Sequence, residues 1–244
     1  NGIDVGLIDY RIEYAHLADY PNLDGFIKDV AENSVLAAPD ILAFSLVVSS
    51  SHQFFERALG ILRKIWPKTT IIIGGFHATN FTEQLLELPG IDYVFRGESE
   101  YALKDFLSDW PDSAKRPIQG VISRAGRYFK PYALCRPLVS MDDNPIPDYG
   151  LPDMQRYVVG NTRMVIKQGS DKVARSANVM TSLGCPFQCT FCASRTVHGR
   201  KMRYKSIDNV VSEFMLLYQH YGVTMFMPED DLFTASRKRT LALL

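Results

Sequence analysis

The first half of the chain alternates short apolar runs with segments of helical periodicity, and this alternation most constrains the fold. The apolar runs are rich in Ile, Val and Phe and cover residues 5–8, 41–48, 70–73 and 93–95. Between them, spaced apolar residues predict helices over 53–66, 82–88 and 101–110. Strands that alternate with helices pair in parallel, with both faces of the sheet covered. We therefore expect an open α/β sheet, which binds ligands at the carboxyl ends of its strands.

Three loops follow the predicted strands and are candidates for ligand contacts. They are Ser49-Ser50-Ser51, Gly74-Gly75-Phe76-His77 and Gly97-Glu98-Ser99. Each has a plain structural interpretation as well. A glycine pair permits a turn with positive φ or a close packing contact, and the serines can cap the next helix. His77 by itself is typical of a loop histidine whose hydrogen bonds are satisfied.

The pattern changes after Trp110. Residues 121–129 predict a small hairpin that turns near Gly126, and residues 142–152 combine three prolines with several aspartates, as a linker does. The sequence thus predicts a first domain over 1–140, a linker over 141–172 and a second domain over 173–244. The chain starts without Met and stops inside a predicted helix, so we expect a fragment of a longer protein.

Charge and cysteine usage narrow the class of protein. Lys+Arg and Asp+Glu are both 27, so the formal net charge is zero, which argues against a nucleic-acid partner. No apolar run approaches the roughly 18 residues of a membrane span, and no signal segment opens the chain, so a soluble cytoplasmic protein is expected. Three of the 4 cysteines cluster, which indicates metal or redox chemistry rather than disulfides.

The cysteine cluster is the strongest chemical signal in the sequence. A predicted strand over 179–183 leads through Gly184 into Cys185, Cys189 and Cys192, with the spacing C-x3-C-x2-C. A tight loop with these intervals can turn three thiolates toward one centre. Three thiolates satisfy three irons of a 4Fe–4S cube, which normally takes four protein ligands. The fourth iron is then open to an exogenous ligand. Cys135 could close that position, but nothing in the spacing recruits it.

A structural zinc site is the alternative. His198 could supply a fourth ligand, although C-x3-C-x2-C-x5-H is an unusual zinc arrangement. The chain would then be a zinc-stabilised, non-catalytic α/β binding module. Its contact surface would be the basic segment 195–205, although a solvated loop is the commoner fate of such a run.

The cysteine loop resembles the signature of radical S-adenosylmethionine (SAM) enzymes, with Phe191 in the aromatic slot. The likeness continues through a predicted helix over 207–221 and a strand over 223–227. The following segment 228–234, Pro-Glu-Asp-Asp-Leu-Phe-Thr, is similar to the "DD-x-F-T" segment of the group that carries an N-terminal cobalamin-binding domain. In the first half of the chain, three segments resemble that cobalamin-binding domain, namely 39–45, 73–79 and 92–100.

The resemblance implies a flavodoxin/Rossmann-like, B12-binding-like sheet followed by the first βα units of a partial (β/α) barrel. It makes Cys185, Cys189 and Cys192 the ligands of a 4Fe–4S cluster whose open iron chelates SAM. Reductive cleavage of SAM then gives a 5′-deoxyadenosyl radical, used for cobalamin-assisted methyl transfer or for oxidative cyclisation as in the anaerobic magnesium-protoporphyrin monomethyl ester cyclase. The substrate is an unspecified small molecule, and the electron donor is a protein such as flavodoxin or ferredoxin.

The resemblance also assigns cofactor contacts residue by residue. Glu229 lies near the position that contacts the SAM amino group, although the family's Gly-Gly-Glu motif is absent; its alternative role is that of a solvated acidic loop residue. Ser45, Gly74 and Gly75 match positions that accommodate the cobalamin tail. The pattern Asp-x-His-x-x-Gly, whose His would ligate cobalt, does not occur in this chain. A radical SAM barrel takes roughly 200 residues, so we expect the fragment by itself to be inactive.

Overall fold

The computed structural model describes residues 2–34, 38–160 and 174–243, and the chain divides into two compact units. The first, which we call the sheet unit, comprises Ile8–Leu138 and Gln188–Gly199. The second, the strand-pair unit, comprises Asn1–Leu7, Val139–Phe187 and Arg200–Leu244. The predicted linker over 141–172 falls in part on residues 161–172, which lie outside the described residues.

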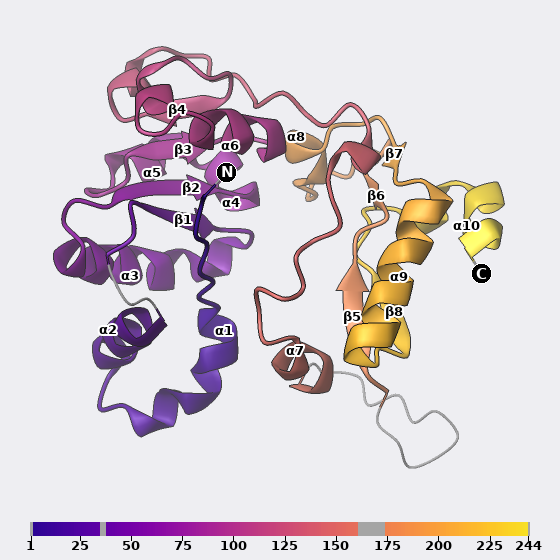
Figure 1. The fold of residues 1–244 in the computed structure, drawn as a ribbon. Coiled ribbons are helices and arrows are strands. Elements are labelled where there is room, and N and C mark those ends of the chain that lie inside the picture. The colour runs from indigo at the N-terminus through magenta and orange to yellow at the C-terminus, as the bar shows by residue number, and fades with distance from the viewer. Residues whose placement is uncertain (1, 35–37, 161–173, 244) are drawn as a thin grey trace. The chain divides into compact units, whose positions relative to one another are not determined.

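The sheet unit is built on four strands in the order β1-β2-β3-β4 (Figure 1). They are β1 Ile41–Ser45, β2 Thr70–Gly74, β3 Tyr93–Phe95 and β4 Val121–Ser123. β1, β2 and β3 pair in parallel, as the sequence predicts. β4, from the segment that the sequence predicts as part of a hairpin, instead pairs with β3 in the antiparallel direction and forms the edge of the sheet.

Helices cover both faces of this sheet. The longer ones are α2 Leu23–Ser34, α3 His52–Ile65, α5 Thr82–Glu87 and α6 Glu100–Leu107, and the short ones are α1 Tyr10–Glu13, α4 Phe76–Asn80 and α8 Ser194–Val197. Short 3-10 helices lie at Tyr14–Asp19, Ser49–Ser51, Asp112–Lys115 and Ala125–Tyr128. Three of the helices correspond closely to the predicted ranges 53–66, 82–88 and 101–110. α2 was not predicted from the sequence, although its buried residues recur at helical spacing.

The alternation of side chains along β2 explains why both faces need a cover. Ile71 and Ile73 join a core with α3 and α5, whereas Ile72 packs on the opposite face with Phe106 of α6. All three isoleucines are at most 3% exposed. Burying each such side chain contributes about 1.5–3 kcal/mol. The second half of α3 also packs against α2 through Leu62.

Two predicted β elements of the first half are wrong. Residues 5–8 form no strand, and Val5 and Leu7 are 57% and 50% exposed, because no described strand pairs with them. Residues 121–129 form no hairpin; β4 ends at Ser123 and a 3-10 helix spans Ala125–Tyr128. The Ser123 hydroxyl accepts the Gly126 amide at 3.1 Å, which turns the chain into this helix.

The strand-pair unit contains two separate strand pairs. β5 Ser176–Val179 pairs in parallel with β8 Met225–Pro228, and β6 Ser182–Leu183 pairs antiparallel with β7 Arg203–Tyr204. The predicted strand over 179–183 is therefore broken at residues 180–181. The helices are α7 Met154–Gly160, α9 Ile207–Tyr221 and α10 Arg237–Leu243, with 3-10 helices at Met141–Asp143 and Phe233–Ala235. A barrel is not formed by the described residues.

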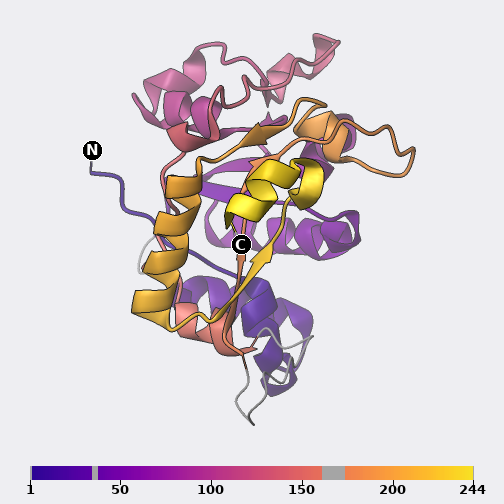
Figure 2. The same ribbon diagram turned by 90° about the vertical axis from the view of Figure 1, so that its right-hand side faces the viewer.

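α9 joins β7 to β8 and packs on the parallel pair. The Ser206 hydroxyl accepts the Asn209 amide at its start, and Gly222, with φ 64°, ends it. Figure 2 shows the short connection from the end of α9 into β8. Phe214 stacks on Phe226 of β8 at 4.0 Å between ring centroids. These caps and this contact explain why the predicted range 207–221 matches α9 at both ends.

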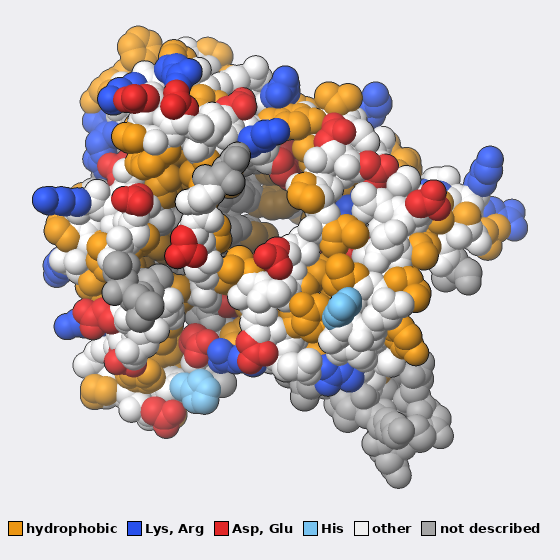
Figure 3. Space-filling model, in the orientation of Figure 1, with side chains coloured by type: hydrophobic (Ala, Val, Ile, Leu, Met, Phe, Trp, Pro, Cys, Tyr) orange, Lys and Arg blue, Asp and Glu red, His pale blue; other side chains and the backbone are white. Residues whose placement is uncertain are grey.

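Three large apolar side chains of α9 are exposed. Val211, Met215 and Tyr218 lie four and three residues apart and are 45%, 45% and 56% exposed. Hydrophobic side chains are visible over this helix in Figure 3. No helix among the described residues, α9 included, is both long and apolar enough to cross a membrane.

Candidate cofactor sites

The carboxyl ends of β1 and β2 bring three predicted cofactor residues together. Ser45 is the register partner of Gly74, and Gly75 follows directly. The Leu46 amide donates to the Gly74 carbonyl at 2.9 Å, and the His77 amide donates to the Leu46 carbonyl at 3.0 Å. The two strand ends are thus joined by backbone hydrogen bonds, and the Ser45 side chain is exposed beside them.

The two glycines have different structural requirements. Gly75 has φ 102°, and a Cβ there would lie 2.6 Å from the Leu46 carbonyl oxygen, so the backbone itself demands glycine. A Cβ on Gly74 would lie 3.7 Å from Phe95 Cβ, 3.9 Å from the Phe95 carbonyl oxygen and 4.0 Å from the Ser99 hydroxyl oxygen, all of which are ordinary contacts. Packing within the chain explains Gly75 and leaves the glycine at 74 unexplained.

His77 lies at the start of α4 in a chain of polar side chains. Its Nδ1 is 2.8 Å from the Ser49 hydroxyl and its Nε2 is 3.0 Å from His52 Nδ1. The ring is buried and stacks on Phe81 with 4.5 Å between centroids. The hydrogen bonds are satisfied, as the plain interpretation expects, but His77 is buried in α4 rather than placed at the surface or in a loop. The role of His52 was missed, since the sequence offers no signal for a pair 25 residues apart.

Acidification is expected to destabilise the sheet unit through His77. Burial, followed by the neighbouring His52, lowers the pKa of His77 below its ordinary value. The unfolded chain then binds the proton more readily, so this contribution to stability is complete above about pH 6.5 and is lost as the pH falls through the folded pKa. We expect His77→Gln to lose less stability than the wild type between about pH 7.5 and about pH 5.5 in urea unfolding.

The exposed His220 provides the control for this experiment. His220→Gln should keep the pH dependence of the wild type. Equal losses of stability for the wild type and His77→Gln on acidification would contradict the assignment.

The loop after β3 contacts the segment that follows the cysteine cluster, through Glu98 and His198. Glu98 Oε1 lies 3.0 Å from His198 Nδ1, and the two side chains are only 2% and 11% exposed. Glu98 Oε2 also accepts the Leu138 amide at 3.3 Å. The His198 ring contacts Phe76 of α4 edge-on, with 5.1 Å between centroids. Residues 188–199 accordingly group with the sheet unit, which nothing in the sequence predicted.

The cysteine loop follows β6. Cys185 is partly buried, whereas Cys189 and Cys192 are exposed, and all three are free thiols. Gly184, which precedes the first cysteine, is buried and has φ 89°. The Cys192 amide donates to the Cys189 carbonyl at 3.2 Å and forms a turn between these two cysteines.

Among the described residues, no three His, Cys, Asp or Glu side chains converge into a geometry that could hold a metal ion. The three cysteines therefore stay predicted ligands, and His198 does not join them. Cys135 is 2% exposed and packs with Ile72 and Phe106 in the core of the sheet unit. Burial raises the pKa of this thiol, which disfavours the thiolate that a metal ligand needs.

Two other residues implied by the resemblance are exposed. The Phe191 side chain is 91% exposed. The Glu229 carboxylate accepts a hydrogen bond from Asn178 Nδ2 at 2.7 Å, and its amide donates to the Val179 carbonyl at 2.9 Å. These contacts place Glu229 at the carboxyl end of the β5–β8 pair. Its role toward SAM stays a prediction.

The basic segment 195–205 is partly committed to internal contacts. Lys205 is 7% exposed, and its Nζ lies 2.6 Å from the buried Glu213 carboxylate. His198 is likewise held by Glu98. Lys205 and His198 are therefore not available for the contact surface that the zinc alternative places on this segment.

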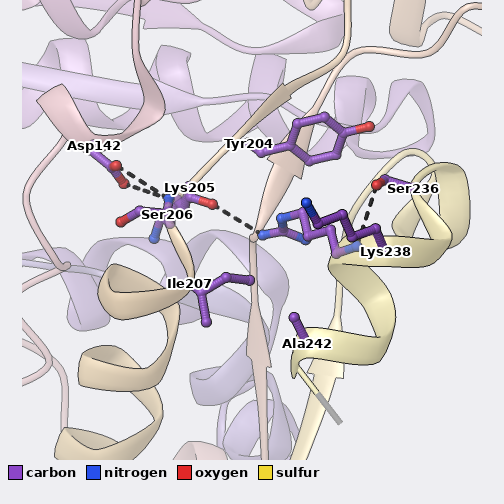
Figure 4. Close-up of a pocket in the computed structure, with 9 residues that line it drawn as sticks. Asp142, Tyr204, Lys205, Ser206, Ile207, Ser236, Lys238 and Ala242 are labelled. Atoms are coloured by element: carbon purple, nitrogen blue, oxygen red, sulfur yellow. Dashed lines mark hydrogen bonds between the residues drawn. The ribbon is translucent and has the colours of Figure 1, made fainter.

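A cavity of about 520 Å³ lies between the start of α9 and α10 (Figure 4). Its polar lining groups serve the fold: the Asp142 carboxylate accepts the Ser206 amide at 3.0 Å, and Arg239 donates to the Lys205 carbonyl at 3.3 Å. The cavity is open, and we assign no ligand to it.

Comparison with known proteins places these features in a family. Residues 1–107 match the family model for the B12 binding domain. An uncharacterised methyltransferase of Pyrococcus horikoshii is 30% identical over 236 residues, which cover 91% of this chain and 47% of that protein. The anaerobic magnesium-protoporphyrin IX monomethyl ester cyclase of Cereibacter sphaeroides is 28% identical over 239 residues, which cover 96% of this chain and 36% of the cyclase.

The solved structures agree on the fold. A radical SAM methyltransferase from Kitasatospora setae superposes with a TM-score of 0.70 at 16% identity, covering 99% of this chain and 44% of that one. The chain spans less than half the length of these relatives. Residues 1–107 are thus similar to B12-binding domains. The chain as a whole is a relative of the B12-dependent radical SAM methyltransferases and magnesium-protoporphyrin cyclases.

Proposed function

We propose that this chain is part of a cobalamin-dependent radical SAM enzyme that carries out methyl transfer or oxidative cyclisation on a small molecule. The observation that carries the proposal is a loop with three free cysteine thiols, spaced C-x3-C-x2-C, in a chain whose residues 1–107 match the B12 binding domain. Within this proposal, β5, α9 and β8 are the first units of the partial barrel, and an electron donor such as flavodoxin or ferredoxin serves the enzyme.

The residues present fit an iron–sulfur cluster by their chemistry. Cys185, Cys189 and Cys192 are soft donors without disulfide partners, and two of them are exposed. Cys135 is buried in the core of the sheet unit, so the proposal gives it no place at the cluster. When bound, a 4Fe–4S cluster with one open iron supplies the electron that cleaves SAM reductively. The three cysteines would hold it, and Glu229 and Phe191 would contact SAM.

The carboxyl edge of the sheet fits the tail of a cobalamin. A Cβ on Gly74 would make only ordinary contacts, so the fold itself does not demand glycine there, and Ser45 exposes a hydroxyl beside it. The satisfied chain of Ser49, His77 and His52 fixes the neighbouring loop. In this proposal Ser45 and Gly74 contact the cofactor, while Gly75 shapes the turn.

The test is the metal and sulfide content of the 244-residue chain after anaerobic reconstitution, with spectra before and after SAM is added. About four irons and four sulfides per chain, with a reduced-cluster resonance that SAM perturbs, are expected. One zinc without sulfide would overturn the proposal in favour of the zinc-stabilised module.

A further inference from the structure

The residues after β5 and those after β8 meet because the two strands are parallel neighbours. Val179 is the register partner of Pro228, so both strands end at the same edge. The segment after β5 leads into the cysteine loop. The segment after β8 begins with Glu229, Asp230 and Asp231. The family resemblance of this acidic run assigns no role to its two aspartates.

Asp230 binds the root of the cysteine loop through both carboxylate oxygens. Its Oδ1 accepts the Thr181 amide at 2.6 Å, and its Oδ2 accepts the Thr181 and Ser182 hydroxyls, each at 2.6 Å. Thr181 and Ser182 are 1% and 0% exposed. Buried donors without an acceptor are costly, so one carboxylate that satisfies three of them fixes the course of the chain here.

Arg239 of α10 completes this polar cluster. Its guanidinium donates to the Thr181 carbonyl at 3.0 Å and to the Thr181 hydroxyl oxygen at 3.1 Å. The Lys205 amide donates to the same carbonyl at 3.0 Å. The hydrogen-bonding groups of Thr181 are thus held by three different parts of the chain, so the base of the loop is rigid where β5 ends.

Asp231 binds the residue that directly precedes the first cysteine. Its Oδ2 accepts the Gly184 amide at 3.0 Å. Gly184 is buried and has φ 89°, a conformation that side chains rarely adopt, and it directly precedes Cys185. The Asp231 carboxylate therefore supports the left-handed turn from which the first predicted iron ligand leaves the strand.

We infer that Asp230 and Asp231 are positioning residues that fix the entry of the cysteine loop for iron–sulfur binding. The inference rests on the proposed function for the identity of the metal centre. Three thiolates that must converge on one cluster lose less conformational entropy on binding when the loop starts from a fixed point. Loss of the Asp231 acceptor should therefore reduce cluster uptake while the fold is retained.

The test compares Asp231→Ala with Asp231→Asn in the 244-residue chain. The asparagine keeps an acceptor oxygen for Gly184, so it should restore what alanine removes. Asp208→Asn is the matched control, because Asp208 lies in the first turn of α9 and its loss removes the same charge. Hydrogen exchange of the peptide that contains the Gly184 amide reports the anchor directly. Iron per chain after reconstitution reports its consequence.

We expect exchange at Gly184 to be roughly tenfold faster in Asp231→Ala, since a charge-assisted hydrogen bond is lost. Iron per chain should fall at least about twofold, with a melting temperature within about 5 °C of the wild type. Asp231→Asn and Asp208→Asn should match the wild type in both measurements. If Asp231→Ala does not fold, Asp231→Glu replaces it, because it keeps the charge and displaces the acceptor.

Unchanged exchange or unchanged iron content in Asp231→Ala would overturn the inference. Failure of the proposed function gives a different combination of exchange rate and iron content. In that case Gly184 protection is lost in Asp231→Ala, but even the wild type takes up no iron. The anchor then exists without an iron site, and the positioning role for iron ligands is refuted.

Discussion

Replacement of Cys189 by alanine is expected to abolish iron–sulfur binding. Loss of one of three thiolates leaves two irons of a 4Fe–4S cube with protein ligands, which is too few to retain it. Iron per reconstituted chain should fall from about four to below about one, with loss of the visible charge-transfer absorption. Stability of the apo chain should change little, because the Cys189 side chain is exposed.

Two control variants show whether the loss of iron is specific to the cysteine loop. Cys135→Ala should keep its iron, since Cys135 is a core residue, although it should lose about 1–2 kcal/mol of stability through the cavity it leaves. His198→Gln should also keep its iron, whereas a zinc site that uses His198 would lose its metal. Full iron and sulfide in Cys189→Ala would refute the ligand assignment.

The parts of the fold predicted from sequence are those where local pattern and tertiary burial agree. α9 has a serine cap, a terminal glycine and an apolar face, so its limits could be read directly. β1, β2 and β3 are apolar on both faces, as parallel strands between helices must be. The alternation of these elements was enough to predict the sheet; ligand binding at the carboxyl ends of its strands stays a prediction.

The errors share a different cause. Residues 5–8 are apolar enough for a strand, but β structure requires a partner, and pairing is not encoded locally. β4 was read as half of a hairpin because Gly126 suggested a turn, whereas its hydrogen bonds go to β3. The same limit applies to the candidate sites. The contact of Glu98 with His198 spans 100 residues, and that of Asp231 with Gly184 spans 47. Neither leaves a pattern in the sequence.

The predictions for the cysteine loop and for the sheet edge are independent. The Cys189 experiment concerns the segment between β6 and α8, whereas cobalamin contacts would lie at the ends of β1 and β2. A chain that retained cobalamin but no iron would keep the role of the B12-binding domain and lose only the radical SAM part of the proposal. The adjacent glycines of the sheet edge allow the cobalamin part to be tested alone.

Gly75→Ala is expected to destabilise the sheet unit by about 3 kcal/mol, because alanine would add backbone strain at φ 102° and a clash with the Leu46 carbonyl. Gly74→Ala should stay within about 1 kcal/mol of the wild type, since its Cβ meets only ordinary contacts. Urea unfolding of the two variants measures this difference.

Cobalamin binding should be sensitive to the glycine whose replacement the fold tolerates. If the cofactor tail packs against Gly74, the added methyl lies in its path, and affinity should fall by about tenfold or more although the fold is intact. Titration of Gly74→Ala with hydroxocobalamin, followed by absorption, measures this loss, with the exposed Gly60→Ala of α3 as the control because its Cβ would meet nothing within 4 Å. If Gly74→Ala binds hydroxocobalamin with wild-type affinity, Gly74 does not contact the cofactor and the glycine at this position has no role in binding it.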